Sequence, residues 1–227
     1  MEGKEPHGPR RAVAREGAFV RLPGDIAVDR TVKLLIPDDA FRGYIFDCDG
    51  TLADTMPLHC RAWKRLLEEY GAPFCEDMFY QWGGRPTERI LEMLRDEHGL
   101  RVGDVRRAAE RKEEYFVEMM HEVKPIAAVL EIARRGHMVL PMAVASGGLR
   151  KYVEMTLDAL GILGLFNTLV CVEDCVRAKP FPDLFLEAAR RLNVPAQECL
   201  VFEDSPSGVQ AAAAAGMQCV IVPRSDT

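Results

Sequence analysis

The chain has 227 residues, of which 48% are hydrophobic and 28% charged, and this suits one globular domain or a core domain with a smaller insert. Its formal net charge of −6 argues against binding to nucleic acid or an anionic membrane through a broad positive surface. A local basic pocket could still bind one phosphate. No stretch approaches the roughly 18 to 20 apolar residues that span a bilayer.

The start of the chain gives little functional information. Residues 1–40 show no clear period and predict an N-terminal extension, whose first residues lack the apolar core of a secretory signal. The seven cysteines are scattered without a Cys-x-x-Cys pair, so neither a disulfide framework nor a structural zinc site is indicated. A cytoplasmic location fits this cysteine usage best.

A buried strand and then a helical insert are expected next. The apolar run at residues 43–46 does not alternate with polar residues, as in strands buried on both faces. From about residue 56 to 124 the patterns are helical, and no convincing strand occurs. The two apolar helical faces in this insert consist of Leu58, Ala62, Leu66 and Tyr70, and of Ile90, Leu91 and Leu94.

Beyond residue 124, short apolar runs alternate with amphipathic helices. One helix carries apolar positions at 185–192, and another runs through Gly208–Ala215, capped by Ser205 or Ser207 and ended by Gly216. Further strands are expected at residues 142–145, 168–172, 199–202 and 218–222.

This alternation predicts an α/β fold with a doubly wound, Rossmann-like parallel sheet. We expect residues 41–55 and 125–227 to form the α/β core, residues 56–124 to form the inserted helical domain, and residues 1–40 to precede both.

Polar or charged residues follow the predicted strands where each strand ends. In open parallel sheets, ligands bind outside the carboxyl ends of the strands, so these side chains are expected to converge on one crevice. In chain order they are Asp47 and Asp49, Ser146, Lys179, and Glu203 with Asp204.

The set has a definite chemical meaning. Clustered carboxylates repel one another unless a cation neutralises them, and all-oxygen ligation favours a hard ion such as Mg²⁺. Lys179 can neutralise a phosphate, while Ser146 and the Thr51 region offer donors to phosphoryl oxygens. Asp47 can act as a nucleophile, and Asp49 can protonate a leaving oxygen and later activate water.

Each residue also has an ordinary structural explanation. Asp-x-Asp-Gly can begin a calcium-binding loop, but Thr51, Leu52 and Leu58 stand where the motif needs an oxygen donor, a glycine and a glutamate. Glu203 and Asp204 could simply start a helix. These explanations would have to hold independently at four strand ends, so we favour one shared site.

Four segments resemble, in order and spacing, the motifs of haloacid dehalogenase-like phosphatases: FDCDGTLADT, VASGG, AKP and FEDSPSG. The resemblance covers about residues 41–222. It implies that Asp47 is the nucleophile, Asp49 the general acid and base, Ser146 with Gly147 the phosphoryl-binding pair, and Lys179 the residue that steadies nucleophile and phosphate.

The same resemblance implies a magnesium site and a cap. Mg²⁺ would be held by the Asp47 side chain, the Asp49 backbone carbonyl and Asp204, with Glu203 assisting. The helical insert would be a mobile cap that closes over the substrate.

Within the superfamily, the insert resembles the β-phosphoglucomutase-like and fructose-1-phosphatase-like branch. MPLHCRAW places His59 near the site, the GGRPTERI loop contributes Gly84, Arg85 and Thr87 to substrate binding, and ERKEEY supplies Lys112. The alternatives are that His59 packs at a hinge, that Lys112 lies on a solvated helix face, and that Arg85 is merely exposed.

Two departures from the mutase pattern bear on the reaction. The mutase has an arginine where this chain has Thr87 and a serine where it has Gly148, which weakens a second phosphate site. We therefore expect Mg²⁺-dependent hydrolysis of a small sugar phosphate, similar to fructose 1-phosphate, with β-phosphoglucomutase as the alternative. A non-catalytic binder would need neither Asp47 nor Asp49. A small phosphorylated metabolite is the expected partner, without nucleic acid or membrane, for a monomer or weak homodimer.

Overall fold

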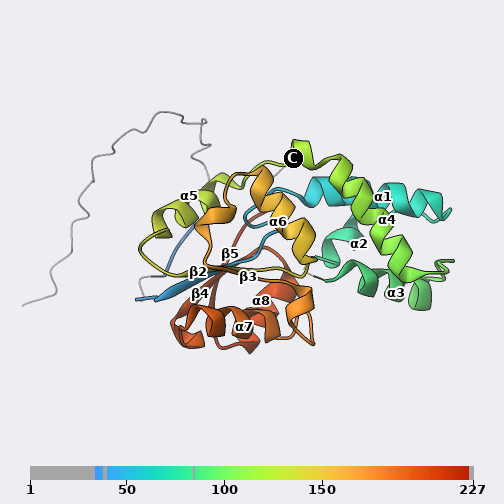
Figure 1. Ribbon diagram of the computed structural model, residues 1–227. Helices are drawn as coiled ribbons and strands as arrows, with labels where there is room; N and C mark the ends of the chain where they lie inside the picture. The colour runs from blue at the N-terminus through green and yellow to red at the C-terminus, as the bar shows by residue number, and fades with distance from the viewer. Residues whose placement is uncertain (1–33, 38–39, 84, 225–227) are drawn as a thin grey trace, which may run out of the picture.

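The computed structural model describes residues 34–37, 40–83 and 85–224, which contain a five-stranded parallel sheet with helices on both faces (Figure 1). The strands are β1 (Gly43–Phe46), β2 (Met142–Ala145), β3 (Thr168–Val170), β4 (Cys199–Glu203) and β5 (Gln218–Ile221). The predicted doubly wound sheet is confirmed, although β3 ends two residues earlier than expected. Most of the predicted extension, residues 1–33 and 38–39, lies outside the described residues.

The order of the strands puts β1 at the centre of the sheet. The order is β3-β2-β1-β4-β5, and Phe46 of β1 pairs with Val144 of β2 on one side and Phe202 of β4 on the other. The chain thus runs outward from β1 in both directions. Such a reversal opens a crevice at the carboxyl ends of the central strands, and Asp47 directly follows β1 at that point.

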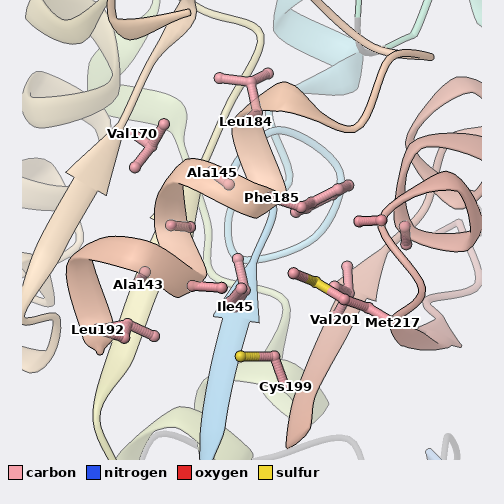
Figure 2. Close-up of a cluster of buried hydrophobic side chains, with 14 of the residues drawn as sticks. Ile45, Ala143, Ala145, Val170, Leu184, Phe185, Leu192, Cys199, Val201 and Met217 are labelled. Carbon is pink, nitrogen blue, oxygen red and sulfur yellow. The ribbon is translucent and has the colours of Figure 1, made fainter. Parts of the chain in front are cut away.

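One apolar layer lies between the sheet and the last two helices. Ile45 and Val201 point into this layer, against α7 (Asp183–Leu192) and α8 (Pro206–Ala214). Figure 2 shows Phe185 of α7 beside these strand residues. Because successive side chains of a strand point to opposite faces, the neighbouring residues form a separate layer on the other side.

The opposite layer contains the larger aromatic side chains. Phe46 stacks on Phe202 with ring centroids 4.6 Å apart, and Val144 lies in the same cluster. The helices that cover this face are α5 (Ala127–Gly136) and α6 (Arg150–Ala159). With both faces covered, the central strands β1, β2 and β4 are largely buried and need no alternation of polar residues, which explains their continuous apolar sequences.

The start of α8 settles one prediction about helix capping. The Ser205 hydroxyl accepts a hydrogen bond of 3.1 Å from the backbone N–H of Gly208, so Ser205 is the N-terminal cap, and not Ser207. The helix begins at Pro206, two residues earlier than expected. It ends before Gly216, whose φ of +72° suits a residue without a side chain.

The chain between β1 and α5 is helical. Its buried apolar side chains, among them Trp63, Leu66 and Leu91, form a cluster of their own. Figure 1 shows these helices to one side of the sheet. Among the described residues 56–83 and 85–122, no residue belongs to a strand. The helices are α1 (Met56–Glu69), α2 (Glu76–Gln81), α3 (Thr87–His98), α4 (Val105–Glu118) and the 3-10 turn η1 (Met120–Glu122).

The two connections between this helical segment and the sheet lie side by side. Ala53 forms a parallel bridge with Asp49 and an antiparallel bridge with Pro125. The backbone N–H of Asp54 also donates to the carbonyl of Lys124 at 2.8 Å. The segment therefore leaves and rejoins the core at one place, where Ala53, four residues after Asp49, meets Pro125.

Two further properties concern the setting of the protein. All seven cysteines lie within the described residues and are free thiols. Across the described ranges, no helix is long and apolar enough to cross a membrane. The remaining short 3-10 turns are η2 (Leu163–Leu165), η3 (Val172–Asp174) and η4 (Ala196–Glu198).

Candidate active site

A cavity of about 830 Å³ lies where the carboxyl ends of the strands meet the helical segment. Thr51, Glu203 and Asp204 are not part of its lining, and Gly84 lies outside the described residues. The predicted site residues that line the cavity are Asp47, Asp49, His59, Arg85, Thr87, Lys112, Ser146, Gly147 and Lys179.

Asp47 and Lys179 form the floor of the site. The Lys179 ammonium donates to Asp47 Oδ1 at 2.6 Å and to Glu203 Oε2 at 2.7 Å, and all three side chains are buried. Burial alone would lower the pKa of Lys179, but the charges of Asp47 and Glu203 outweigh it and raise that pKa. Lys179 is therefore a permanent cation beside Asp47.

Glu203 is held by backbone and side-chain donors. Its Oε1 accepts hydrogen bonds from the N–H of Asp204 at 3.1 Å, the N–H of Ser205 at 2.9 Å and the Ser205 hydroxyl at 2.8 Å. A Cβ atom on Gly208 would lie 1.9 Å from Glu203 Oε2, so only glycine fits there. With Oε2 bonded to Lys179, Glu203 orients both the lysine and the turn that carries Asp204.

Three carboxylates gather at this floor. Oxygen atoms of Asp47, Glu203 and Asp204 lie within 4.8 Å of one another. Burial, and then the neighbouring acids, raises the pKa of Asp47 to about 8, while burial followed by the charges of Asp47 and Glu203 raises that of Asp204 to about 9. When all three carboxylates are ionised, one ammonium leaves two negative charges uncompensated, so this oxygen donor set fits a divalent hard cation.

The backbone approaches this cluster closely at Gly50. Gly50 has a φ of +87°, and a Cβ atom there would lie 2.3 Å from Asp204 Oδ2. The Thr51 hydroxyl donates to Asp204 Oδ1 at 3.4 Å, and Thr51 is fully buried. Its side chain thus helps to place Asp204, and its direct contact with substrate stays a prediction.

The carboxylate of Asp49 faces away from the other acids. It accepts hydrogen bonds from the Thr55 hydroxyl at 2.7 Å and from His59 Nε2 at 3.3 Å. Burial would raise the pKa of Asp49, but these bonds and the nearby positive charges lower it to about 2. Asp49 is thus an ionised carboxylate that faces the cavity, while its side chain stays out of the cluster formed by Asp47, Glu203 and Asp204.

A line of polar contacts runs from Asp49 into the helical segment. Lys112 Nζ lies 2.6 Å from His59 Nδ1, and the imidazole ring of His59 stacks on Phe116 with centroids 4.0 Å apart. Lys112 is 2% exposed, so the alternative of a solvated helix face is wrong. The structure thereby brings His59 and Lys112 together with Asp49.

Two contributors to this line were not predicted. Glu113 accepts from Lys112 at 3.0 Å and from the Thr87 hydroxyl at 2.8 Å, and Thr55 binds Asp49. A signal for Glu113 existed in the sequence: Ala108, Ala109, Lys112, Glu113, Tyr115 and Phe116 recur at helical spacing, and all of them are buried.

The second motif places a compact turn beside Asp49. Ser146 is buried, and its hydroxyl accepts from the N–H of Gly148 at 3.0 Å. A Cβ atom on Gly148 would lie 3.3 Å from both Ser146 Oγ and Val153 Cγ2, so the turn is tightly packed. Arg85, by contrast, is exposed at the rim, with its guanidinium 3.9 Å from the Met93 sulfur.

These features agree with a comparison to known families. The family described as haloacid dehalogenase-like hydrolase matches residues 44–222, and the chain therefore belongs to the haloacid dehalogenase-like hydrolases. The resemblance inferred from the four sequence motifs is confirmed.

Individual relatives support the same placement. The chain is 34% identical to the fructose-1-phosphate phosphatase YqaB of Escherichia coli over 184 residues, 81% of this chain and 97% of that protein. It is also 34% identical to a phosphorylated carbohydrates phosphatase of Thermotoga maritima over 179 residues, 77% and 81% of the two chains. The crystal structure of β-phosphoglucomutase from Clostridium difficile superposes with a TM-score of 0.73 over 79% of this chain and 83% of that one, and at 24% identity it shows the shared fold.

Proposed function

We propose that this protein is a Mg²⁺-dependent phosphatase that hydrolyses a small sugar phosphate such as fructose 1-phosphate. The chain is a phosphoric monoester hydrolase by its family and by relatives named as phosphatases. The observation that carries the rest is the placement of Asp47 on the cavity floor, held by Lys179, with the Asp49 carboxylate facing the same space.

In the first step, an oxygen of Asp47 attacks phosphorus while the bond from phosphorus to the sugar oxygen breaks. The electron pair of that bond goes to the sugar oxygen, which takes a proton from Asp49. Asp49 is ionised in the free enzyme, so it must first take up a proton from solvent, which the negative charge of the bound phosphate favours by raising the pKa of Asp49. Lys179 and Ser146 offset charge on the phosphoryl oxygens.

In the second step, water attacks the phosphorus of the aspartyl-phosphate. Asp49, again a carboxylate, takes a proton from this water, and the bond between phosphorus and Asp47 breaks to release inorganic phosphate. The hydrogen bonds from Thr55 and His59 favour the ionised form of Asp49 that this step needs.

The magnesium ion would be held by the carboxylates of Asp47 and Asp204 and by the backbone carbonyl of Asp49. Glu203 assists from its place beside Asp204, although four hydrogen-bond donors already engage its carboxylate. Bound there, the ion supplies positive charge that compensates the clustered acids and the phosphoryl oxygens.

Residues 56–124 are proposed to act as a cap on a core of residues 41–55 and 125–227. The apolar cluster within the helical segment supports this division. Cap and core also meet at a polar contact, since the Ser207 hydroxyl donates to the carbonyl of Gly83 at 2.7 Å. The free cysteines support a cytoplasmic location.

The substrate assignment follows from the relatives and from the wall of the cavity that the cap provides, where Thr87, Lys112 and Glu113 lie. Thr87 does not offer the positive charge of an arginine, and its hydroxyl is bonded to Glu113. This favours a substrate with a single phosphate over the bisphosphate intermediate of a mutase. Relatives named for fructose 1-phosphate and phosphorylated carbohydrates point to sugar monophosphates.

The test is phosphate release with magnesium over a panel of sugar monophosphates that includes fructose 1-phosphate and β-glucose 1-phosphate. Glucose 6-phosphate formation is followed in parallel, with and without glucose 1,6-bisphosphate. Rapid phosphate release is the expected result. Conversion of β-glucose 1-phosphate to glucose 6-phosphate with little free phosphate would make the protein a mutase.

A further inference from the structure

The inner face of α4 presents a cation and an anion side by side. Lys112 is 2% exposed and Glu113 8% exposed, and both line the cavity. Buried charges are rare in helices unless they are paired or serve a ligand, and here the pair faces the space that the substrate must occupy.

The hydrogen bonds of this pair are incomplete. Lys112 Nζ has three protons, and it makes contacts to His59 Nδ1 and to Glu113 Oε1. Glu113 Oε1 also accepts from Thr87, whereas Oε2 receives no hydrogen bond from any described residue. No fully inaccessible side-chain oxygen of the described residues lacks a partner, so Oε2 is at least partly accessible, and Glu113 lines the cavity.

The charge of this wall is balanced. Burial would raise the pKa of Glu113, but Lys112 and then His59 outweigh it, so the pKa is lowered and the carboxylate stays ionised. Lys112 and Glu113 thus form one pair of opposite charges, and this pair by itself offers no excess of positive charge to a second anion. Three of the four cavity-lining arginines of the described chain pair with a carboxylate: Arg89 with Glu92, Arg106 with Glu88 and Arg177 with Asp183. The fourth, Arg85, keeps its charge at the exposed rim, where its guanidinium lies 3.9 Å from the Met93 sulfur.

We propose that Glu113, anchored by Thr87, selects substrates whose phosphate-free part is uncharged and carries adjacent hydroxyl groups. One hydroxyl donates to Glu113 Oε2, and its neighbour accepts from the remaining proton of Lys112. A second phosphate or a carboxylate in the same place would face the ionised Glu113 and be rejected. This inference rests on the proposed phosphatase function and specifies its substrate class.

A purely structural role for Glu113 would be to neutralise Lys112. Both roles predict a less stable protein when Glu113 is changed, so stability does not separate them. Only the selective role predicts a changed preference between neutral and anionic substrates, because only that role brings Glu113 against the substrate.

The experiment compares kcat/KM for fructose 1-phosphate and fructose 1,6-bisphosphate, which differ by one phosphate, in the parent and in Glu113→Gln. The parent should prefer the monophosphate, and Glu113→Gln should lower that preference about tenfold, because the amide keeps the shape and removes the charge. Glu114→Gln is the matched control, since Glu114 lies on the outer face and pairs with Arg111. An unchanged preference in Glu113→Gln, or an equal change in Glu114→Gln, would overturn the proposal.

A second variant tests the anchor. Thr87→Val keeps the charge of Glu113 but removes its hydroxyl partner, so kcat/KM for the monophosphate should fall while the bisphosphate remains the poorer substrate. If Thr87→Val instead lowered the preference for the monophosphate by the tenfold expected of Glu113→Gln, the charge of Glu113 would not be the source of that preference.

Binding separates this proposal from the phosphatase assignment. If no panel member releases phosphate, the proposed function fails. The affinities of Asp47→Asn for the same two ligands, measured by calorimetry, then decide the inference. Tighter binding of the monophosphate, lost on adding Glu113→Gln, supports it, and equal affinities in both variants contradict it.

Discussion

Around Asp47, side chains are fixed by backbone donors and by a buried lysine, whereas around Lys112 they are fixed mainly by one another. Glu203 accepts two backbone N–H bonds at the end of β4 and positions Lys179 through its second oxygen. Lys112 depends on His59 and Glu113, which come from two different helices. The floor of the site is therefore fixed by the backbone at the ends of the strands, and the opposite wall is held by contacts between side chains of different helices.

This difference predicts a division of labour. A change on the floor alters charge at the reacting phosphorus and should affect every substrate alike. A change on the wall should alter which substrates are used, with a smaller effect on the reaction itself. Each of the following variants tests one side of that comparison.

The largest effect is expected from Asp47→Asn. Without a nucleophile, turnover should fall by about four orders of magnitude or more on every substrate. Because the ionised Asp47 is unfavourable in the metal-free fold, the melting temperature without magnesium should not fall. Substantial residual activity, or loss for some substrates only, would contradict the assignment of Asp47.

The next largest effect is expected from magnesium on the thermal stability of the protein. The raised pKa values of Asp47 and Asp204, about 8 and 9 against an ordinary 3.8, mean that the metal-free fold loses stability as the pH rises through this interval. Magnesium should reverse this loss, so its stabilisation, measured as a shift in melting temperature, should be larger at pH 8 than at pH 5.

Asp204→Asn provides the site-specific form of this test. It should remove most of the magnesium-dependent shift and lower kcat on all substrates by about a hundredfold or more. Asp96→Asn, at an exposed position that pairs with Arg95, is the control and should retain both properties. A full magnesium shift in Asp204→Asn would exclude this residue as a ligand.

Lys112→Ala tests the wall. We expect a loss of about tenfold to a hundredfold in kcat/KM for sugar phosphates, with a smaller loss for an aryl phosphate that has no hydroxyl groups. Lys64→Ala, at an exposed position of α1, is the matched control. Equal losses on both kinds of substrate would show that Lys112 acts in the reaction step, and the proposed difference between floor and wall would then be wrong.

The smallest effect is expected from Ser207→Ala. It removes the hydrogen bond to the Gly83 carbonyl and should raise KM about twofold to tenfold, with kcat nearly unchanged, because one neutral hydrogen bond contributes about 0.5 to 1.5 kcal/mol. A lower kcat with an unchanged KM would show that this contact serves the reaction and not the closure of the site.

The sequence predicted the floor better than the wall for a physical reason. Asp47, Ser146 and Lys179 follow strands or the loops after them, and parallel strands bring such positions to one edge whatever the helices do. The runs of the central strands β1, β2 and β4 were readable for a related reason, because strands buried on both faces consist mainly of apolar residues.

The wall depends on how helices pack: the helical spacing along α4 indicates a buried position at Glu113, but it does not indicate what that residue contacts. Glu113 stands in a run of charged residues that is typical of a solvated face, yet α4 turns this position into the cavity. The bond from Thr87 to Glu113 joins α3 to α4, and the contact of Ser207 with Gly83 joins positions 124 residues apart. Each pairing follows from tertiary structure and from no spacing along the chain.

The adjacent bridges of Ala53 with Asp49 and Pro125 have a consequence for how such enzymes diversify. A segment that departs and returns at one point can be lengthened, shortened or replaced by recombination without separating any two strands. Ancestral genes could thus acquire new substrate preferences by exchanging a single insertion. The reaction would be inherited unchanged, while the choice of metabolite would vary between lineages.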